Sequence, residues 1–255
     1  MKSALITFGC SWTAGVGSGY TEGMTIENFN KLRWNDSIND RQSFRGLLSK
    51  KYNLVNINWA AGGSSNQRQF RLAKLFFSSD EFKELRQNFD RILVLWGITS
   101  TARNEMFSIE HNDLVNFFYS ESSNLAKSLV RYSYNHKNEV DQLSIEILHW
   151  NTFFKSLNIN NLWFDTFNHH DYFRPDLKNL MFNDEKPRDI LSKLAIHNGF
   201  VDLDGSYHES TGSIDTNRLK NLVECKVLNP LSYHPTPQGH RQIADMLSEY
   251  LEASL

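Results

Sequence analysis

Cysteine and proline are scarce in this sequence, and each scarcity excludes a class of protein. Only two cysteines, Cys10 and Cys225, occur in 255 residues and they stand far apart, so neither a disulfide framework nor a metal site of paired cysteines is expected. The five prolines and thirteen glycines are scattered, and no low-complexity stretch or repeat interrupts the chain. Because nothing resembles a linker, we expect residues 1–255 to form a single domain.

Long apolar runs and an excess of charge of one sign are absent as well. The first apolar run, residues 4–8, stops at Gly9, which is too early for a signal peptide, and no later run has the length of a membrane span. Acidic and basic residues are interspersed and the formal net charge is -2, so binding to nucleic acid or to an anionic membrane is not predicted. A cytoplasmic protein is therefore expected.

Short apolar runs alternate with amphipathic stretches along most of the chain. The runs predict buried strands at residues 4–8, 54–59, 91–96 and 161–166 with a short fifth strand at 200–203, and the stretches predict helices at 42–52, 67–77, 80–89, 190–198 and from Pro237 onward. Strand-helix-strand units of this kind form right-handed crossovers between parallel strands. The pattern predicts an α/β fold with a mostly parallel sheet of about five strands.

Two longer segments are less regular. Residues 20–40 are rich in polar residues and glycine without a clear period, which favours a long loop, and such a loop could form a lid over a site. Residues 110–157 show helical spacing in at least two pieces. The apolar positions are Leu114, Phe117, Phe118, Leu125 and Leu129 in the first piece, and Leu143, Ile147, Trp150 and Phe154 in the second.

Three of the predicted strands end in turns made of small residues, at positions 9–15, 58–66 and 97–103. The carboxyl ends of central strands in an α/β sheet face the crevice where such sheets bind ligands. Ser11, on the first turn, is therefore a candidate nucleophile, and a simple cap or turn residue is the alternative. The neighbouring Cys10 is a rival nucleophile, although a small buried thiol is the more common role.

The segment before the C-terminal helix holds a histidine in a suitable place for proton transfer. Thr236 is predicted to cap a helix that begins at Pro237, which leaves His234 on the preceding loop. With an ordinary pKa of roughly 6.5, a histidine can take a proton from a serine nucleophile and return it. His240, inside the first turns of the helix, is expected to pack or to lie at the surface.

No metal or cofactor is predicted. The segment 168–171 reads Asn-His-His-Asp, but neighbouring histidines on an extended chain point to opposite faces, so a polar loop is the better interpretation. No Gly-x-x-x-x-Gly-Lys-Ser/Thr segment is present, which argues against a nucleotide-binding P-loop.

Taken together, the small-residue turns and the histidine segment resemble the SGNH, or GDSL-type, hydrolases. Residues 8–13 resemble the first block of that family, with Ser11 in the place of the nucleophile. The other blocks follow in family order: 58–66 resembles the second with Gly63 as the oxyanion-hole glycine, 95–99 the third, and 234–240 the fifth. The resemblance implies a three-layer α/β/α sandwich of the flavodoxin-like type. The substituted blocks are also similar to those of SGNH-like proteins of tailed phages.

Two positions depart from the family pattern. The third block usually has an asparagine two residues after its glycine, where its amide donates to the oxyanion, and here Thr99 stands in that place. The acid of the triad usually lies three residues before the histidine, and that position is Leu231. The ring of His234 must then be oriented by a backbone carbonyl, by another acid such as Asp202 or Asp204, or by nothing.

The resemblance implies a serine esterase. His234 would take the proton from Ser11 as it attacks an ester carbonyl, and the amides of Ser11 and Gly63 with Thr99 would hold the oxyanion. The substrate would be a small-molecule or glycan ester, with Asn66 and Arg103 as candidate substrate-binding residues, the latter for a carboxylate or phosphate. The alternative is a degenerate domain that only binds a carbohydrate or a protein. The oligomeric state is not predicted.

Overall fold

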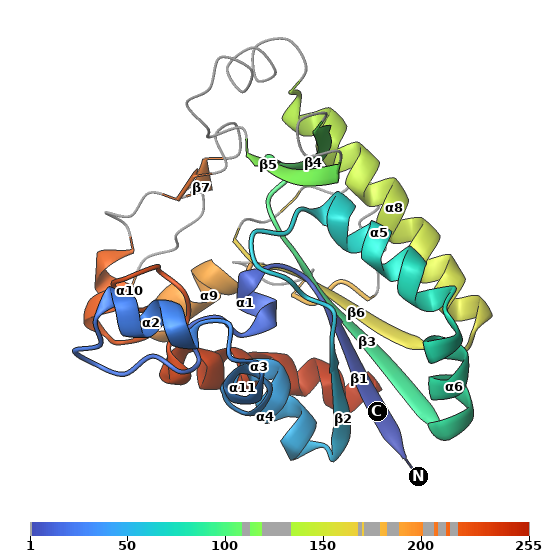
Figure 1. The fold of residues 1–255 in the computed structure, drawn as a ribbon, viewed down its shortest axis with the longest axis horizontal. Helices are drawn as coiled ribbons and strands as arrows, with labels where there is room; N and C mark the ends of the chain where they lie inside the picture. Colours follow the sequence, from blue (N-terminus) through green and yellow to red (C-terminus); the bar gives the residue numbers. More distant parts are fainter. Residues whose placement is uncertain are drawn as a thin grey trace.

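The computed structural model describes residues 2–108, 113–118, 134–167, 170, 179–182, 189–200, 207–208, 213–214 and 219–254. Its centre is a four-stranded sheet in the order β2-β1-β3-β6, in which all three pairings are parallel (Figure 1). The strands are β1 (Ser3–Phe8), β2 (Leu54–Asn58), β3 (Arg91–Ile98) and β6 (Asn160–Asp165). The predicted parallel sheet is thereby confirmed.

Helices cover both faces of this sheet (Figure 1). One face packs against α4 (Phe44–Lys51), α9 (Ile190–His197) and α11 (Pro237–Ser254), and the other against α5 (Asn66–Phe77), α6 (Asp80–Asn88) and α8 (His136–Ser156). Successive residues of a strand point to opposite faces of the sheet. Leu5 packs in the core beneath α4, α9 and α11, and Ile6 packs in the core beneath α5, α6 and α8. The fold is a three-layer α/β/α sandwich, as the resemblance implied.

Aromatic side chains fill much of the core on the α5 and α8 face. The ring of Trp96 lies between Phe8 and Trp163, at centroid distances of 4.6 Å and 4.7 Å, so three neighbouring strands are joined by stacked rings. Each strand contributes one ring from the same register position, because Phe8 pairs with Trp96 and Trp96 with Trp163. The stack lies at the last residue of β1 and two residues before the ends of β3 and β6, close to the turns that follow these strands.

The strand order creates a switch point between β1 and β3. β2, the next strand in the sequence after β1, lies on one side of β1. The chain then crosses over, and β3 lies on the other side of β1. Ligands of open α/β sheets bind outside the carboxyl ends of the strands at such a point. Ser11 follows β1 and Thr99 follows β3, so both lie at this place in the fold.

The prediction of a loop over residues 20–40 is wrong. Two short helices, α2 (Ile26–Leu32) and α3 (Asp36–Gln42), occupy most of the segment. Each begins at a capping side chain, since Thr25 accepts from the amide of Asn28 and Asn35 from that of Ile38. Phe29 and Asn39 are the respective buried residues, so the segment lacks the apolar period that identifies a longer helix.

The prediction of two helical pieces between residues 110 and 157 is half correct. The second piece is α8, whereas the described part of the first is β5 (Asp113–Phe118), paired antiparallel with β4 (Arg103–Ser108). A short apolar window such as Leu114 to Phe118 fits a strand as well as a helix, and the partner strand decides the outcome. Leu125 and Leu129 lie outside the described residues.

The predicted fifth strand at 200–203 lies outside the described residues except for Phe200. The outer edge of β6 instead makes isolated parallel bridges, from Trp163 to Leu180 and from Asp165 to Asp189. The remaining elements are short: α1 (Ser11–Ala14), α10 (Lys220–Glu224), β7 (Tyr207–His208) and β8 (Ser213–Ile214). Within the residues described above, no helix is long and apolar enough to cross a membrane.

Candidate functional site

The turn after β1 carries Ser11 at the first position of α1. It requires a glycine at position 9, because Gly9 has a φ of +149° and an added Cβ would lie 2.9 Å from the carbonyl oxygen of Gly97. The amide of Gly9 is held by the side chain of Gln69 at 2.8 Å. This close packing of the β1 and β3 ends brings Ser11 to the switch point of the sheet.

Ser11 and His234 are in hydrogen-bond contact, although they stand at opposite ends of the sequence. The Oγ of Ser11 lies 2.8 Å from Nε2 of His234. On the other side of the ring, Nδ1 lies 2.9 Å from the carbonyl oxygen of Ser232 and 3.0 Å from its Oγ. Because a carbonyl only accepts, Nδ1 carries the ring proton and Nε2 is free to accept from the Ser11 hydroxyl.

The turn that presents His234 is organised by Asn229, which is fully buried. Its Oδ1 accepts from the amides of Leu231 and Ser232 at 3.2 Å and 2.9 Å and from the Ser232 hydroxyl at 3.0 Å. Its Nδ2 donates to the backbone oxygen of His234 at 2.8 Å, and Tyr233 takes a φ of +56° to close the turn. The sequence analysis did not single out Asn229. An asparagine five residues before the histidine, in a segment expected to turn, was the signal that could have identified it.

The position where the family has its acid does not orient the ring. The backbone amide of Leu231 donates to Oδ1 of Asn229. The contact with the imidazole comes from the next residue, Ser232. The two other acids considered, Asp202 and Asp204, lie outside the described residues. Of the alternatives left open by the sequence, the geometry realises a backbone carbonyl.

The His234 imidazole is strongly biased toward its neutral form. Burial lowers its pKa to about 4, and the positive charges of Arg103 and Arg33 act in the same direction, against the opposing effect of the Ser232 carbonyl bond. A neutral imidazole whose Nε2 faces a serine hydroxyl has the protonation state of a general base.

The turn after β2 brings Gly63 alongside the β1 turn. The amide of Ala61 donates to the carbonyl of Gly9 at 3.1 Å, and Gly63 takes a φ of +65° at the tip. In the part of the chain that the structure describes, the backbone amides of Ser11 and Gly63 donate to no protein acceptor. The Oγ1 of Thr99 is likewise buried without a hydrogen-bond partner. These three donors, from the turns after β1, β2 and β3, therefore have no acceptor among the described residues.

Asn66, predicted to bind substrate, has a different set of contacts. Its Nδ2 donates to the carbonyl of Thr99 at 2.8 Å, and its Oδ1 accepts from the amide of Thr99 at 3.0 Å. Gln69, one turn later, joins Gly9 to the hydroxyl of Ser64 at 2.6 Å. The first residues of α5 therefore tie the three turns together, a role that required tertiary contacts and left no sequence signal.

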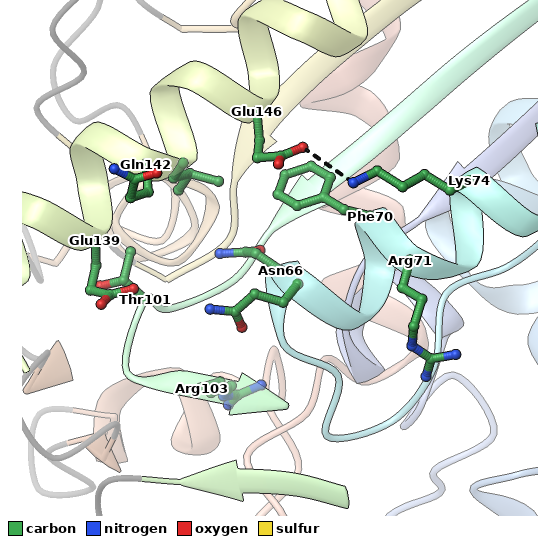
Figure 2. A pocket seen from close by; sticks show the side chains of 11 residues that line it. Asn66, Phe70, Arg71, Lys74, Thr101, Arg103, Glu139, Gln142 and Glu146 are labelled. Carbon is green, nitrogen blue, oxygen red and sulfur yellow. Dashed lines mark ion pairs between the residues drawn. The ribbon is translucent and has the colours of Figure 1, made fainter. Parts of the chain in front are cut away.

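A cavity of about 410 Å³ lies beside the third turn, between α5, α8 and the start of β4 (Figure 2). Phe70 and Leu143 contribute apolar surface to its lining, and Asn66, Thr101 and Arg103 contribute polar groups. The guanidinium of Arg103 lies 5.1 Å from the ring of Phe167, which packs edge-on against Trp12 at 5.2 Å. Trp12 follows Ser11, so this chain of contacts connects the cavity to the β1 turn.

The remaining candidates fall outside the site. Cys10 is fully buried beside Ser11 and packs in the core of the α4 and α11 face. His240 is buried and accepts from the amide of Phe44 at 3.3 Å, which fits the packing role predicted for it. Of the possible metal segment 168–171, His170 alone is described, and it is buried.

No family model and no curated protein matches the sequence. Solved structures do resemble it. A carbohydrate esterase gives a TM-score of 0.47 at 12% identity, over 98% of this chain and 68% of its own. An acetyl xylan esterase from the rumen bacterium Butyrivibrio proteoclasticus gives 0.47 at 14% identity, over 99% of this chain and 64% of its own. A protein from Desulfitobacterium hafniense DCB-2, described as lipolytic and of the G-D-S-L family, gives 0.38 at 11% identity, over 98% and 99%.

None of these proteins is described as coming from a phage. The structure itself shows a parallel α/β/α sandwich in which the small-residue turns follow β1, β2 and β3.

Proposed function

We propose that the protein is a serine ester hydrolase in which Ser11 is the nucleophile and His234 the general base. The observation that carries the proposal is the 2.8 Å contact between Ser11 Oγ and His234 Nε2, with Nδ1 of the same ring bound to a carbonyl that fixes the required tautomer. The low pKa of His234 keeps that base neutral over the range in which most enzymes work.

In the first half of the reaction, the Ser11 oxygen forms a bond to the ester carbonyl carbon as its proton moves to Nε2 of His234. The oxyanion of the tetrahedral intermediate is held by the amides of Ser11 and Gly63 and by the hydroxyl of Thr99. As the intermediate collapses, the bond to the alcohol breaks and His234 returns its proton to the leaving oxygen. In the second half, His234 takes a proton from water as the water oxygen bonds to the acyl carbon. The bond from that carbon to Ser11 Oγ then breaks, His234 returns the proton to Oγ, and the acid is released.

A slow reaction is expected, because a neutral carbonyl replaces the usual acid. In serine hydrolases with a full triad, loss of the acid costs about 10⁴-fold, and much of that cost comes from the wrong tautomer. Ser232 keeps the right tautomer here, so part of the cost is avoided. The Ser232 carbonyl does not neutralise the imidazolium that forms, and burial together with Arg103 and Arg33 disfavours it.

The direct test is hydrolysis of 4-nitrophenyl acetate by the purified wild type, Ser11→Ala and His234→Ala. The controls are Ser78→Ala and His149→Ala, which change an exposed serine and an exposed histidine outside the site. Turnover should disappear in the first two variants and persist in the controls. Covalent capture of Ser11 by a fluorophosphonate, detected as added mass that Ser11→Ala lacks, requires no knowledge of the natural ester. A folded wild type without Ser11-dependent turnover or labelling contradicts the proposal.

The second candidate is a binding domain for a carbohydrate or a protein, which the absence of an acid at Leu231 favours. It predicts that Ser11→Ala retains full ligand affinity in a glycan-binding screen while neither protein hydrolyses esters. Small-molecule and glycan esters are the substrates proposed for the enzyme.

A further inference from the structure

Arg33, between α2 and α3, belongs to no ion pair in the described part of the chain. Its Nε is buried and has no hydrogen-bond partner. By contrast the buried Arg45 is paired with Asp40 at 2.6 Å. Arg33 as a whole is half-buried, so its guanidinium is held against the protein and remains accessible to a ligand.

The backbone of Arg33 is fixed beside the His234 turn. Its carbonyl accepts from Nδ2 of the buried Asn39 at 3.0 Å, and Oδ1 of Asn39 accepts from Ser18 at 3.0 Å. The preceding residue, Gly17, lies against the histidine so closely that an added Cβ would stand 3.0 Å from Cβ of His234. Two hydrogen bonds and one close packing contact thus connect the backbone of Arg33 to the base of the His234 side chain.

The next residue, Trp34, covers the oxyanion turn. An added Cβ on Gly62 would stand 1.8 Å from Cη2 of Trp34, so the indole lies directly on this glycine, next to Gly63. The guanidinium carbon of Arg33 is 5.5 Å from the same indole ring. Arg33 therefore flanks the indole that covers the oxyanion turn, and its charge acts on His234.

Arg103 supplies a second cation near the imidazole, from the side of the cavity. Two further cations line that cavity, and both are paired: Arg71 contacts Glu105 at 2.6 Å, and Lys74 approaches Glu146 at 4.0 Å, while Arg103 also has partners of its own. Glu139 is the remaining acid there, and burial raises its pKa, which weakens its negative charge. Two cations from different elements, Arg33 and Arg103, thus act on the His234 imidazole.

We propose that the natural ester carries an oxyanion, a carboxylate or a sulfate, on its alcohol portion, and that Arg33 binds this group with Arg103 as a second contact. This inference rests on the proposed hydrolase function. The alcohol portion is the relevant one because His234 returns its proton to the leaving oxygen, so groups beside the imidazole belong to the alcohol. The bidentate geometry of a guanidinium suits both oxyanions.

The test compares 4-acetoxy-3-nitrobenzoate, which has an anionic leaving group, with its neutral methyl ester on the same ring. A 4-acetoxy-3-nitrobenzenesulfonate arm distinguishes a sulfate from a carboxylate preference. For the wild type we expect kcat/KM to be at least about tenfold higher for the anion, the ratio that one charge-assisted contact provides. Arg33→Gln should abolish the preference, Arg33→Lys should restore part of it, and the exposed Arg41→Gln should keep both the preference and the rate for the neutral ester.

Equal kcat/KM values for the anionic and neutral esters, with turnover that depends on Ser11, would overturn the inference and leave the hydrolase proposal intact. If neither ester is hydrolysed, the hydrolase proposal fails, and binding decides the anion site separately. Ser11→Ala should bind 4-hydroxy-3-nitrobenzoate about tenfold more tightly than Ser11→Ala combined with Arg33→Gln. Equal dissociation constants for these two proteins would refute anion binding by Arg33.

Discussion

The carbonyl oxygen of Ser232 lies 2.9 Å from Nδ1 of His234, two residues further along the same turn. A backbone carbonyl therefore orients the imidazole of His234, as a carboxylate does in a full triad. A carbonyl fixes the tautomer and the ring plane, but it carries no charge to stabilise the imidazolium. The quality of the contact depends on the shape of the turn from Asn229 to His234.

We therefore expect Asn229 to affect activity, because it holds the turn that orients His234. Asn229→Ala removes the acceptor of three donors and the donor to the His234 carbonyl, so we expect kcat to fall at least about tenfold with little change in KM. The free energy of unfolding should fall by about 1–3 kcal/mol, because buried donors lose their partner. Urea denaturation and steady-state kinetics measure the two effects.

The control for this variant is Asn221→Ala, which changes an exposed asparagine of α10. If folded Asn229→Ala has the same kcat as the control, the ring of His234 stays oriented without the hydrogen bonds of Asn229.

The pH profile should reveal the shifted histidine. Because the pKa of His234 is lowered to about 4, the base stays neutral in the folded protein well below its ordinary value of 6.5. We expect kcat/KM for a neutral ester to remain level from neutral pH down to about pH 5 and to fall through about pH 4. Arg33→Gln should move the acid limb slightly upward, since a cation near the imidazole is lost. A limb near 6.5 in the wild type would contradict the burial of the ring.

Much of the fold could be predicted because the four sheet strands are apolar runs bounded by small-residue turns. Ser11 and His234 could be chosen as candidates for the same reason, because each stands at the boundary of a strand or helix with a clear apolar pattern. The helices α2 and α3 escaped prediction because caps, and not an apolar stripe, define them. The β4 and β5 pair escaped because pairing between strands decides the state of a short apolar window.

The unpredicted parts of the site share a different cause. Ser232 acts through its backbone carbonyl, which every residue possesses, and Gln69 acts by joining turns that are distant in sequence. Arg33 resembles any surface arginine until Asn39 and Trp34 are seen to hold it beside the site. Such roles depend on how the backbone and the neighbouring residues are arranged in space. The residue type alone does not predict them.

His240 should make the protein sensitive to acid. It is fully buried and burial lowers its pKa to about 3, so the unfolded chain binds a proton near pH 6.5 that the folded chain refuses. Stability therefore falls as the pH drops from 6.5 toward 3, and this one group accounts for about 2 kcal/mol between pH 6.5 and pH 5. Urea denaturation at pH 7, 6 and 5 should show a shallower loss for His240→Gln than for the wild type. Parallel curves for the two proteins would disprove the assignment.

Thr99 offers the sharpest separation between stability and chemistry. Its Oγ1 is buried without a partner, so Thr99→Val, which replaces that hydroxyl with a methyl group of similar size, should leave the free energy of unfolding unchanged or raise it. If the hydroxyl donates to the oxyanion only in the transition state, kcat should fall by up to about 10²-fold while KM stays constant.

The matched variant is Thr101→Val, which removes a hydroxyl that contacts Tyr134 at 3.2 Å in the same turn. Loss of that contact should lower stability without a comparable loss of kcat. A wild-type kcat in Thr99→Val would mean that the backbone amides of Ser11 and Gly63 are the whole oxyanion site. Thr99 would then be a packing residue whose unpaired hydroxyl the fold tolerates.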